Sequence, residues 1–427
     1  MRTSIINFFF ALAVLAIPAV IFRPPGDTWL MVSDFPAYYG AAKLISHGHA
    51  ADVYEIHRLQ LEIRRAWRMP PERQVFVAEP PIFMPAFEPL ANFTPNGAVL
   101  FSFITAIAAT ALSLVLLSEA LVLSNRATLW LIALTASSGP FWESMHCGKP
   151  VPFMLLGLSF AIYLLSIYRR PLAGVATVVA LMKWHEILPF LAFSSGAKKY
   201  GYLLAILCSA VLLGIASTAI FGVVGWVNYF HLLGDMSKNP INVGYQSMPT
   251  LRGQLCLMGV NWTMVNAAAA IAYAASLIFL GWFGRRFANL EHWWIPGITC
   301  SSLAAVTFGL HSHQYDVLLL TPALCILIKE AAAARNRGLL GVAGALVAIY
   351  ALPVYVSIHY GYFGSIRLGI GALNPFFLAL LATTIYAFVF FGRSWSLLKS
   401  PHSGVRRFEE FDIRDKIEGR MAQAGGR

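Results

Sequence analysis

Long apolar runs dominate this chain of 427 residues and limit what it can fold into. Hydrophobic residues make up 58% of the sequence and charged residues only 12%, whereas a soluble domain usually contains about 25% charged residues. A water-soluble core cannot bury this much apolar surface, so lipid must be the solvent for most of it. The composition therefore predicts an all-α protein that crosses a membrane many times.

The length of the runs predicts the number of spans. A helix needs roughly 20 apolar residues to cross about 30 Å of hydrocarbon. The first run is read as an uncleaved span, because it is long for a signal peptide and no clean cleavage site follows it. Runs that indicate about ten full spans cover residues 5–22, 97–118, 128–142, 151–167, 200–221, 263–282, 293–310, 315–334, 338–358 and 370–392. We therefore expect a membrane domain over 1–392 and a polar cytoplasmic tail over 393–427.

Basic residues mark one side of these spans. They lie at Arg2, Arg126, Arg169, Arg170, Lys198, Lys199, Arg285, Arg286, Arg335, Arg337 and Arg393. The positive-inside rule assigns this side to the cytoplasm. We therefore expect a multi-pass protein of the plasma (inner) membrane with both termini inside and two long periplasmic loops, 23–96 and 222–262. The net charge of +11 is explained by this topology, and no nucleic-acid partner is expected.

The segment 172–194 does not fit the alternation, because basic pairs on both of its sides should be cytoplasmic. Two short helices joined at the polar Lys183-Trp184-His185-Glu186 would bring both ends to one side. Each arm of about 11 residues would rise about 16 Å. The alternative is a single span with one basic pair on the unexpected side.

Two features of the outer loops complete the expected organisation. Apolar residues at helical spacing over 53–68 predict an amphipathic helix that lies in the membrane interface. Cys147 and Cys256 fall in outer loops, so they could form a disulfide, although spacing alone does not establish one.

Ionisable residues gather on the predicted outer side and indicate an outward-facing site, since such groups near a membrane tend to be paired or functional. Asp34, just beyond the first span, is either a general base for a hydroxyl group or the N-cap of the following helix. The cations and histidines that could hold a phosphate are Lys149, Lys183, His185, Arg252, His311 and His313. The cations among them could instead extend to lipid headgroups.

The sequence also limits the reaction class. No P-loop, GxSxG, dinucleotide fingerprint or HExxH motif occurs, which argues against a nucleotide-driven machine or a zinc protease. His311 and His313 could bind a metal, but no third ligand follows at a recognisable spacing. No cofactor is therefore expected.

Several short segments, in order along the chain, resemble glycosyltransferase family 87. The first is Asp34-Phe35-Pro36-Ala37-Tyr38-Tyr39-Gly40-Ala41-Ala42, followed by Ala51-Asp52-Val53-Tyr54. Later ones are Glu79-Pro80-Pro81 to Pro89-Leu90, Gly148-Lys149-Pro150 to Leu156, Lys183 to Pro189, Gln246-Ser247 and Tyr315-Asp316. Glu79, Lys149 and Trp184 depart from the residues usual in the family.

The resemblance implies a C-type glycosyltransferase fold and an inverting transfer from a polyprenyl-phosphate sugar, with mannose as the default, to a lipid or glycan acceptor. It implies that Asp34 is the catalytic base. Residues expected near the donor are Lys183, His185, Arg252, His311, His313 and Gln314, and those expected on the acceptor side or along the cavity are Tyr38, Tyr39, Glu79, Lys149 and Asp316.

Two alternatives remain open at the level of sequence. A transporter or flippase of lipids or sugar-lipids would show inverted repeats and polar residues at mid-bilayer in both halves. The polar clusters lie mostly on one side, which favours the enzyme. A non-catalytic assembly subunit with the same fold is the other alternative.

Overall fold

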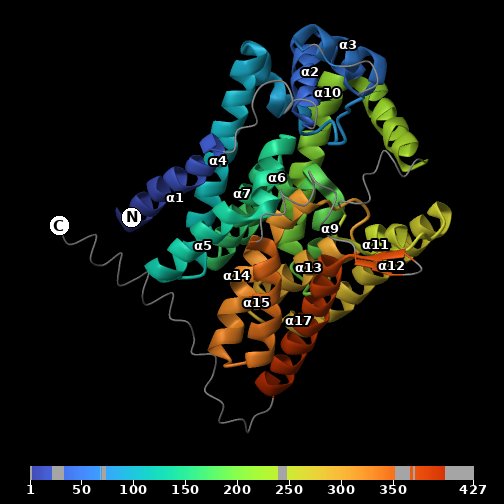
Figure 1. The fold of residues 1–427 in the computed structure, drawn as a ribbon. Helices are drawn as coiled ribbons and strands as arrows, with labels where there is room; N and C mark the ends of the chain where they lie inside the picture. Colours follow the sequence, from blue (N-terminus) through green and yellow to red (C-terminus); the bar gives the residue numbers. More distant parts are fainter. Residues whose placement is uncertain are drawn as a thin grey trace.

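The computed structural model describes residues 2–21, 33–67, 69, 74–238, 248–351, 366–368 and 371–399. Within these ranges the chain is helical except for loops and one hairpin, in which β1 (Ile366–Leu368) pairs antiparallel with β2 (Gly371–Leu373) (Figure 1). The predicted helical class is confirmed. The Gln246-Ser247 segment and the tail beyond residue 399 lie outside the described residues.

The helices follow the apolar runs closely, because a run ends where polar residues or helix-breaking residues begin. Among the described residues, five segments are long and apolar enough to cross a membrane, namely 95–120, 170–196, 200–236, 262–287 and 376–393. The total of about ten spans stays a prediction. The helices that correspond to the runs are α1 (Arg2–Ile21), α4 (Pro95–Ala120), α5 (Asn125–Ser137), α6 (Gly139–Cys147), α7 (Val151–Ser166), α10 (Tyr200–Lys238), α12 (Trp262–Gly284), α13 (Trp294–Phe308), α14 (Thr321–Ala333), α15 (Arg337–Ala351) and α17 (Pro375–Lys399).

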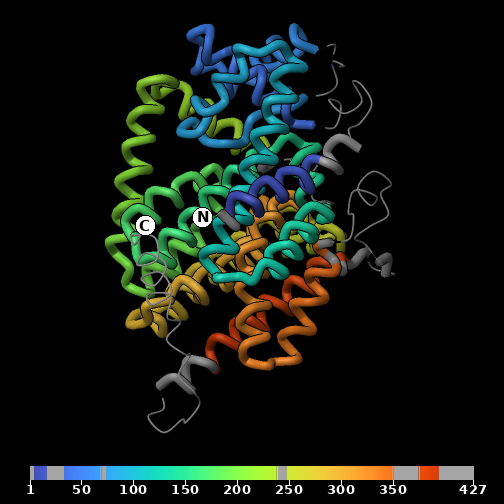
Figure 2. Tube along the Cα trace, turned by 90° about the vertical axis from the view of Figure 1, so that its left-hand side faces the viewer, coloured from blue at the N-terminus to red at the C-terminus, as the bar shows by residue number. Residues whose placement is uncertain are grey.

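The first predicted loop forms a small unit with its own apolar cluster, which we call the outer unit. It consists of α2 (Phe35–Ser46), η2 (Ala50–Tyr54), α3 (Ile56–Ala66) and η3 (Met84–Asn92). Both views show it at one end of the molecule, opposite the ends of α15 and α17 (Figures 1 and 2). Helix α3 forms within the predicted amphipathic stretch, with Leu59 and Ile63 buried against α2 and with Arg58 and Arg65 exposed. Its place in the membrane interface stays a prediction.

Helix α10 links the outer unit to the rest of the fold. It is broken at Gly222, whose φ of 63° and ψ of 176° are not helical. Beyond the break the helix packs on the outer unit, where Asn228 donates to the Ala51 carbonyl at 3.3 Å and the Tyr229 ring lies 5.2 Å from that of Tyr54. The predicted loop 222–262 therefore begins with a further helical stretch that ends at Lys238, and it also contains α11 (Leu251–Leu257).

The polar segment that did not fit the topology is bent near its middle. It comprises α8 (Arg170–Thr177), η4 (Val178–Lys183) and α9 (Trp184–Gly196). The Tyr202 hydroxyl lies 2.6 Å from Thr177 Oγ1, and its ring lies 5.8 Å from that of Phe190. The backbone leaves helical geometry at Lys183, whose φ is −125° and ψ is 81°, so the segment bends there. The hairpin stays a prediction, because 170–196 is also long and apolar enough to cross a membrane as one segment.

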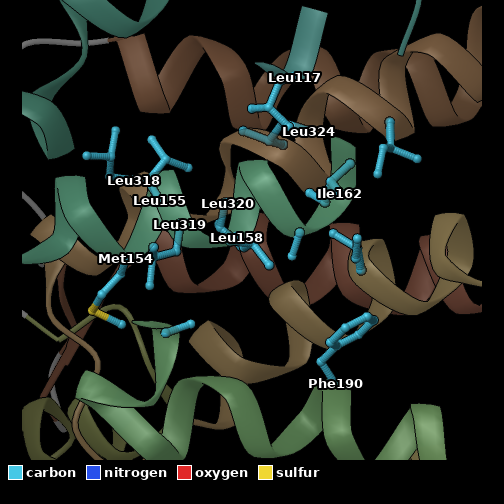
Figure 3. Packing of buried hydrophobic residues seen from close by; sticks show 14 of the residues in the cluster. Leu117, Met154, Leu155, Leu158, Ile162, Phe190, Leu318, Leu319, Leu320 and Leu324 are labelled. Carbon is cyan, nitrogen blue, oxygen red and sulfur yellow. The ribbon is translucent and has the colours of Figure 1, made fainter. Parts of the chain in front are cut away.

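The main core fixes the segment that carries part of the candidate site. The short helix η8 (Gln314–Leu320) sends Leu318, Leu319 and Leu320 into a cluster with Leu155 and Leu158 of α7 (Figure 3). These three leucines are between 0 and 7% exposed. Their burial holds η8 in place, so the polar residues at its start have fixed positions.

Candidate active site

Asp34 forms an ion pair with Lys149. The Lys149 Nζ lies 2.7 Å from Asp34 Oδ2, and the Asp34 side chain is 36% exposed while that of Lys149 is 10% exposed. Asp34 occupies the N-cap position of α2, but its side chain makes no capping hydrogen bond. The carboxylate is therefore directed to the lysine rather than to the helix end, and it remains open to solvent.

A glycine turn brings the two partners together. Gly148 ends α6 in the left-handed region, with φ of 63° and ψ of 30°. A Cβ atom at this position would lie 2.6 Å from the Phe35 Cβ, so only glycine permits this approach. The Asp34 N–H donates to the Cys147 carbonyl at 3.0 Å. The start of α2 is thus fastened directly beside Lys149.

A second lysine–aspartate pair is fully buried. Lys183 Nζ, at the bend between η4 and α9, donates to both carboxylate oxygens of Asp316 at 2.7 Å. The Asp316 side chain is 0% exposed, and its Oδ2 also accepts from the His313 N–H at 2.8 Å. This carboxylate has donors on both oxygens and no access to water, as expected of a group that holds the structure together.

The Tyr315 ring links the two pairs. Lys149 Nζ lies 5.4 Å and Lys183 Nζ 4.5 Å from its centroid. Distances below about 6 Å are those of cation–π contacts. Both ammonium groups therefore belong to one site. Burial opposes the charge of Lys149, but the charges of Asp34 and Glu79 outweigh it and raise the pKa of the Lys149 ammonium above its ordinary value.

The predicted histidines and arginine lie around the same centre. His311 Nε2 and His313 Nε2 are 3.2 Å apart, so one imidazole donates to the other. The His185 Nε2 donates to the His311 carbonyl at 3.3 Å. Arg252 donates to the Leu310 carbonyl at 2.6 Å through Nη1. Burial lowers the pKa values of His311 and His313 well below the ordinary value, so both rings are neutral at neutral pH.

Glu79 closes the outer side of this centre. Its Oε1 accepts from the Tyr38 hydroxyl at 2.6 Å, and its backbone carbonyl accepts from the Tyr54 hydroxyl at 2.8 Å. The Tyr38 ring stacks on Phe87 at 4.8 Å. The charge of Glu79 also contributes to the raised pKa of Lys149. The outer unit thus contributes a carboxylate as well as Asp34.

Two predicted residues have other surroundings. The Tyr39 hydroxyl donates to the Phe93 carbonyl at 3.1 Å, and its ring packs against Trp67 in the outer unit. Among the described residues, Tyr39 makes no contact with either lysine–aspartate pair. Its role along a cavity therefore stays a prediction. Gln314 follows His313, and its Oε1 is buried without a hydrogen-bond partner in the described parts of the chain.

Several residues of the centre were not among the predicted site residues. Tyr315 and Glu186 stood inside motifs, but nothing in the sequence gave them a role. Glu186 accepts a hydrogen bond from Ser312 and lines a cavity of about 30 Å³ with apolar neighbours. Asn266 accepts from Arg252 at 2.6 Å. Only contacts between distant segments identify these partners, although the polar stretch Lys183-Trp184-His185-Glu186 marks this part of the chain in the sequence.

The described residues give no support to a metal centre or a disulfide. Among them, no three His, Cys, Asp or Glu side chains are arranged to hold a metal ion. No disulfide joins Cys147 and Cys256 in the described structure. The centre is therefore a set of cations, carboxylates and aromatic rings, which suits binding of an anionic, hydroxyl-bearing substrate.

Comparison with known proteins agrees with this chemistry. A family model described as glycosyltransferase family 87 matches residues 78–290, about half of the chain. No curated protein and no solved structure matches. The match includes Glu79, Lys149, Lys183 and Arg252, and the family implies glycosyltransferase activity in a membrane protein. The chain is a member of glycosyltransferase family 87.

Proposed function

We propose that this protein transfers a hexose, mannose by default, from a polyprenyl-phosphate donor to a lipid or glycan acceptor at the periplasmic face of the plasma membrane. The observation that carries the proposal is the solvent-accessible Asp34 carboxylate, paired with Lys149, whose ammonium faces the same Tyr315 ring as the buried Lys183. A base must be reachable by the acceptor hydroxyl, and a phosphate leaving group needs fixed positive charge.

In the reaction, Asp34 accepts the proton of the acceptor hydroxyl while the hydroxyl oxygen forms a bond with the anomeric carbon. The bond between that carbon and the phosphate oxygen breaks, and its electrons leave with the polyprenyl phosphate. A single displacement of this kind inverts the anomeric centre. The phosphate is a stable leaving group, so no second carboxylic acid has to protonate it.

Lys149 connects the two halves of this reaction. Its ammonium is 2.7 Å from the base and also faces the Tyr315 ring that borders Lys183. When a donor phosphate binds, it competes with Asp34 for Lys149 and releases the carboxylate to act on the acceptor. Charge that develops on the departing phosphate is then stabilised more strongly than charge in the bound donor, which is what accelerates the step.

The positions of the basic residues indicate on which side of the membrane the site lies. The basic residues that end the predicted spans lie opposite the outer unit in the sequence-based topology, and the positive-inside rule assigns them to the cytoplasm. Asp34 begins the outer unit, so the proposed chemistry lies on the periplasmic side. The polyprenyl chain would stay in lipid while its phosphate reaches the lysines.

The test uses purified protein in liposomes with radiolabelled polyprenyl-phosphate mannose, glucose and other hexoses, and membrane lipid extract as the source of acceptor. We expect label to appear in a new glycolipid or glycan for one donor, with the anomeric configuration inverted. Movement of intact donor between leaflets without any transfer would instead support the flippase alternative. Absence of both would leave a non-catalytic role and overturn the proposal.

A further inference from the structure

Glu79 is a buried carboxylate with only one of its two oxygens in a hydrogen bond. Its residue is 2% exposed. Oε1 accepts from Tyr38, whereas Oε2 is buried without a hydrogen-bond partner among the described residues. A buried acceptor that has lost water and gained no donor is unfavourable. Such an oxygen in a functional centre calls for a ligand that supplies the donor.

The protein groups around Glu79 hold it firmly in place. The Tyr38 hydroxyl binds its side chain, the Tyr54 hydroxyl binds its backbone, and the Tyr38 ring is stacked on Phe87. Pro80 and Pro81 follow directly and restrict the backbone. A carboxylate fixed in this way cannot turn to find another partner, so its free oxygen has a defined position.

The chemistry of the missing partner is restricted. It has to be a hydrogen-bond donor, which excludes phosphate oxygens, since these are acceptors and carry the same sign of charge. Lys149 already provides positive charge nearby, and its Nζ is 2.7 Å from Asp34. A neutral hydroxyl group fits these conditions, and in a glycosyltransferase the substrates rich in hydroxyl groups are sugars.

We propose that Glu79 Oε2 accepts a hydrogen bond from one hydroxyl of a sugar ring and so determines which sugar this enzyme uses. The inference rests on the proposed function, which it deepens by assigning a specificity residue. The hydroxyl belongs either to the transferred hexose or to a sugar acceptor. Glu79 takes no proton in this role, because the base is the accessible Asp34.

A site built to bind a hydroxyl rejects an analogue that lacks it, because the protein acceptor is then left unpaired. We therefore expect wild-type kcat/KM to fall roughly 10⁴–10⁵-fold when one particular hydroxyl of the sugar is removed. Removal of other hydroxyls should have smaller effects. The pattern identifies the hydroxyl that Glu79 binds.

The experiment compares wild type with Glu79→Gln. Glutamine keeps an oxygen for the Tyr38 hydroxyl and replaces Oε2 with an NH₂ group, which cannot accept. The first arm uses short-chain polyprenyl-phosphate hexoses that each lack one hydroxyl. The second arm uses methyl hexosides and their monodeoxy forms as soluble acceptors. We expect the variant to lose discrimination at one hydroxyl, in the arm that contains the sugar bound by Glu79.

Two further variants keep the test decisive. Glu143→Gln is the matched control, since Glu143 also has a buried Oε2 without a hydrogen-bond partner in the described ranges, and it should retain the wild-type pattern. If Glu79→Gln does not fold, Glu79→Asp withdraws the oxygens while keeping the charge and should weaken discrimination at the same hydroxyl.

The outcomes separate this inference from the function on which it rests. Identical discrimination by wild type and the Glu79 variants in both arms would overturn the role of Glu79 while leaving the transferase intact. A wild-type protein that transfers no sugar from any donor would overturn the proposed function, and the specificity role with it. Tighter use of an amino sugar than of its hydroxyl parent, abolished in Glu79→Gln, would also contradict the hydroxyl assignment.

Discussion

The two lysine–aspartate pairs of this protein have the same N–O distance of 2.7 Å but different surroundings. The Asp316 side chain is 0% exposed and accepts from Lys183 and from a backbone N–H. The Asp34 side chain is 36% exposed at the junction between the outer unit and α6. Access to water distinguishes the two pairs, while the pair distance does not. In our proposal this difference makes Asp316 a structural support and Asp34 the reactive group.

The largest expected effect on stability is that of Asp316→Asn. Removing one partner of a buried ion pair typically costs about 3–5 kcal/mol, because the other charge is left without compensation. Asp34→Asn should cost about 1 kcal/mol, as expected for a pair with a solvent-exposed member. Thermal unfolding of the purified proteins in detergent measures both. Equal losses of stability would show that the two pairs have the same role.

The glycine turn between α6 and Lys149 provides the next test. Gly148→Ala forces a Cβ into a left-handed residue at a distance of 2.6 Å from Phe35. The backbone conformation alone should cost about 1–2 kcal/mol. Gly259→Ala is the control, since Gly259 has φ of 76° with no atom within 4 Å of an added Cβ. We expect similar backbone penalties in both variants, but a transfer rate that falls about 10²-fold only for Gly148→Ala. Equal rates would contradict the role of this turn.

Glu143 gives a pH test near the buried pair. Burial, with a contribution from the charge of Asp316, raises the pKa of Glu143 to about 8. Between the ordinary pKa of about 4.3 and this value, the unfolded chain has lost a proton that the folded protein retains. The free energy of unfolding must therefore fall as the pH rises through this window. The Glu143→Gln variant should lack this decline. The difference in unfolding free energy between the variant and wild type should therefore grow up to about pH 8 and then stay constant. A difference in melting temperature between the variant and wild type that stays the same from about pH 5 to about pH 9 would contradict the assignment.

The histidines should give the smallest effect. His311 and His313 have pKa values well below the ordinary range, mainly because burial disfavours the imidazolium form. Both rings stay neutral through neutral pH, so the pH profile of kcat/KM should show no inflection near about 6.5 from these groups. His313→Gln should leave the shape of that profile unchanged. An inflection that disappears in the variant would mean that a histidine titrates in the reaction.

The sequence predicted the helices well because the length of an apolar run is a local property. The run 263–282 became α12 (Trp262–Gly284), and the run 151–167 became α7 (Val151–Ser166). The predicted loop 222–262 was less accurate, because apolar residues continue past the break at Gly222. A single glycine with a positive φ breaks the helix, and a second helical stretch follows it directly.

The site was predicted as a set of residues but not as an arrangement. Asp34, Lys149, Lys183 and Asp316 were each named from the sequence, yet Lys183 and Asp316 are 133 residues apart. No local pattern shows that each aspartate selects one lysine, or that Tyr315 lies beside both. The N-cap alternative for Asp34 was also reasonable, and only the direction of its side chain toward Lys149 argues against capping.

The most direct test of the catalytic base is the single-turnover transfer rate of folded Asp34→Asn protein. Its matched control is Asp235→Asn, which changes an exposed carboxylate that pairs with Lys238 on α10. General base catalysis typically contributes 10²–10⁴-fold, so we predict a loss of about that size for Asp34→Asn, with donor binding no weaker than in wild type and only the small loss of stability given above. Asp235→Asn should transfer sugar at the wild-type rate. A wild-type rate for folded Asp34→Asn would contradict the account.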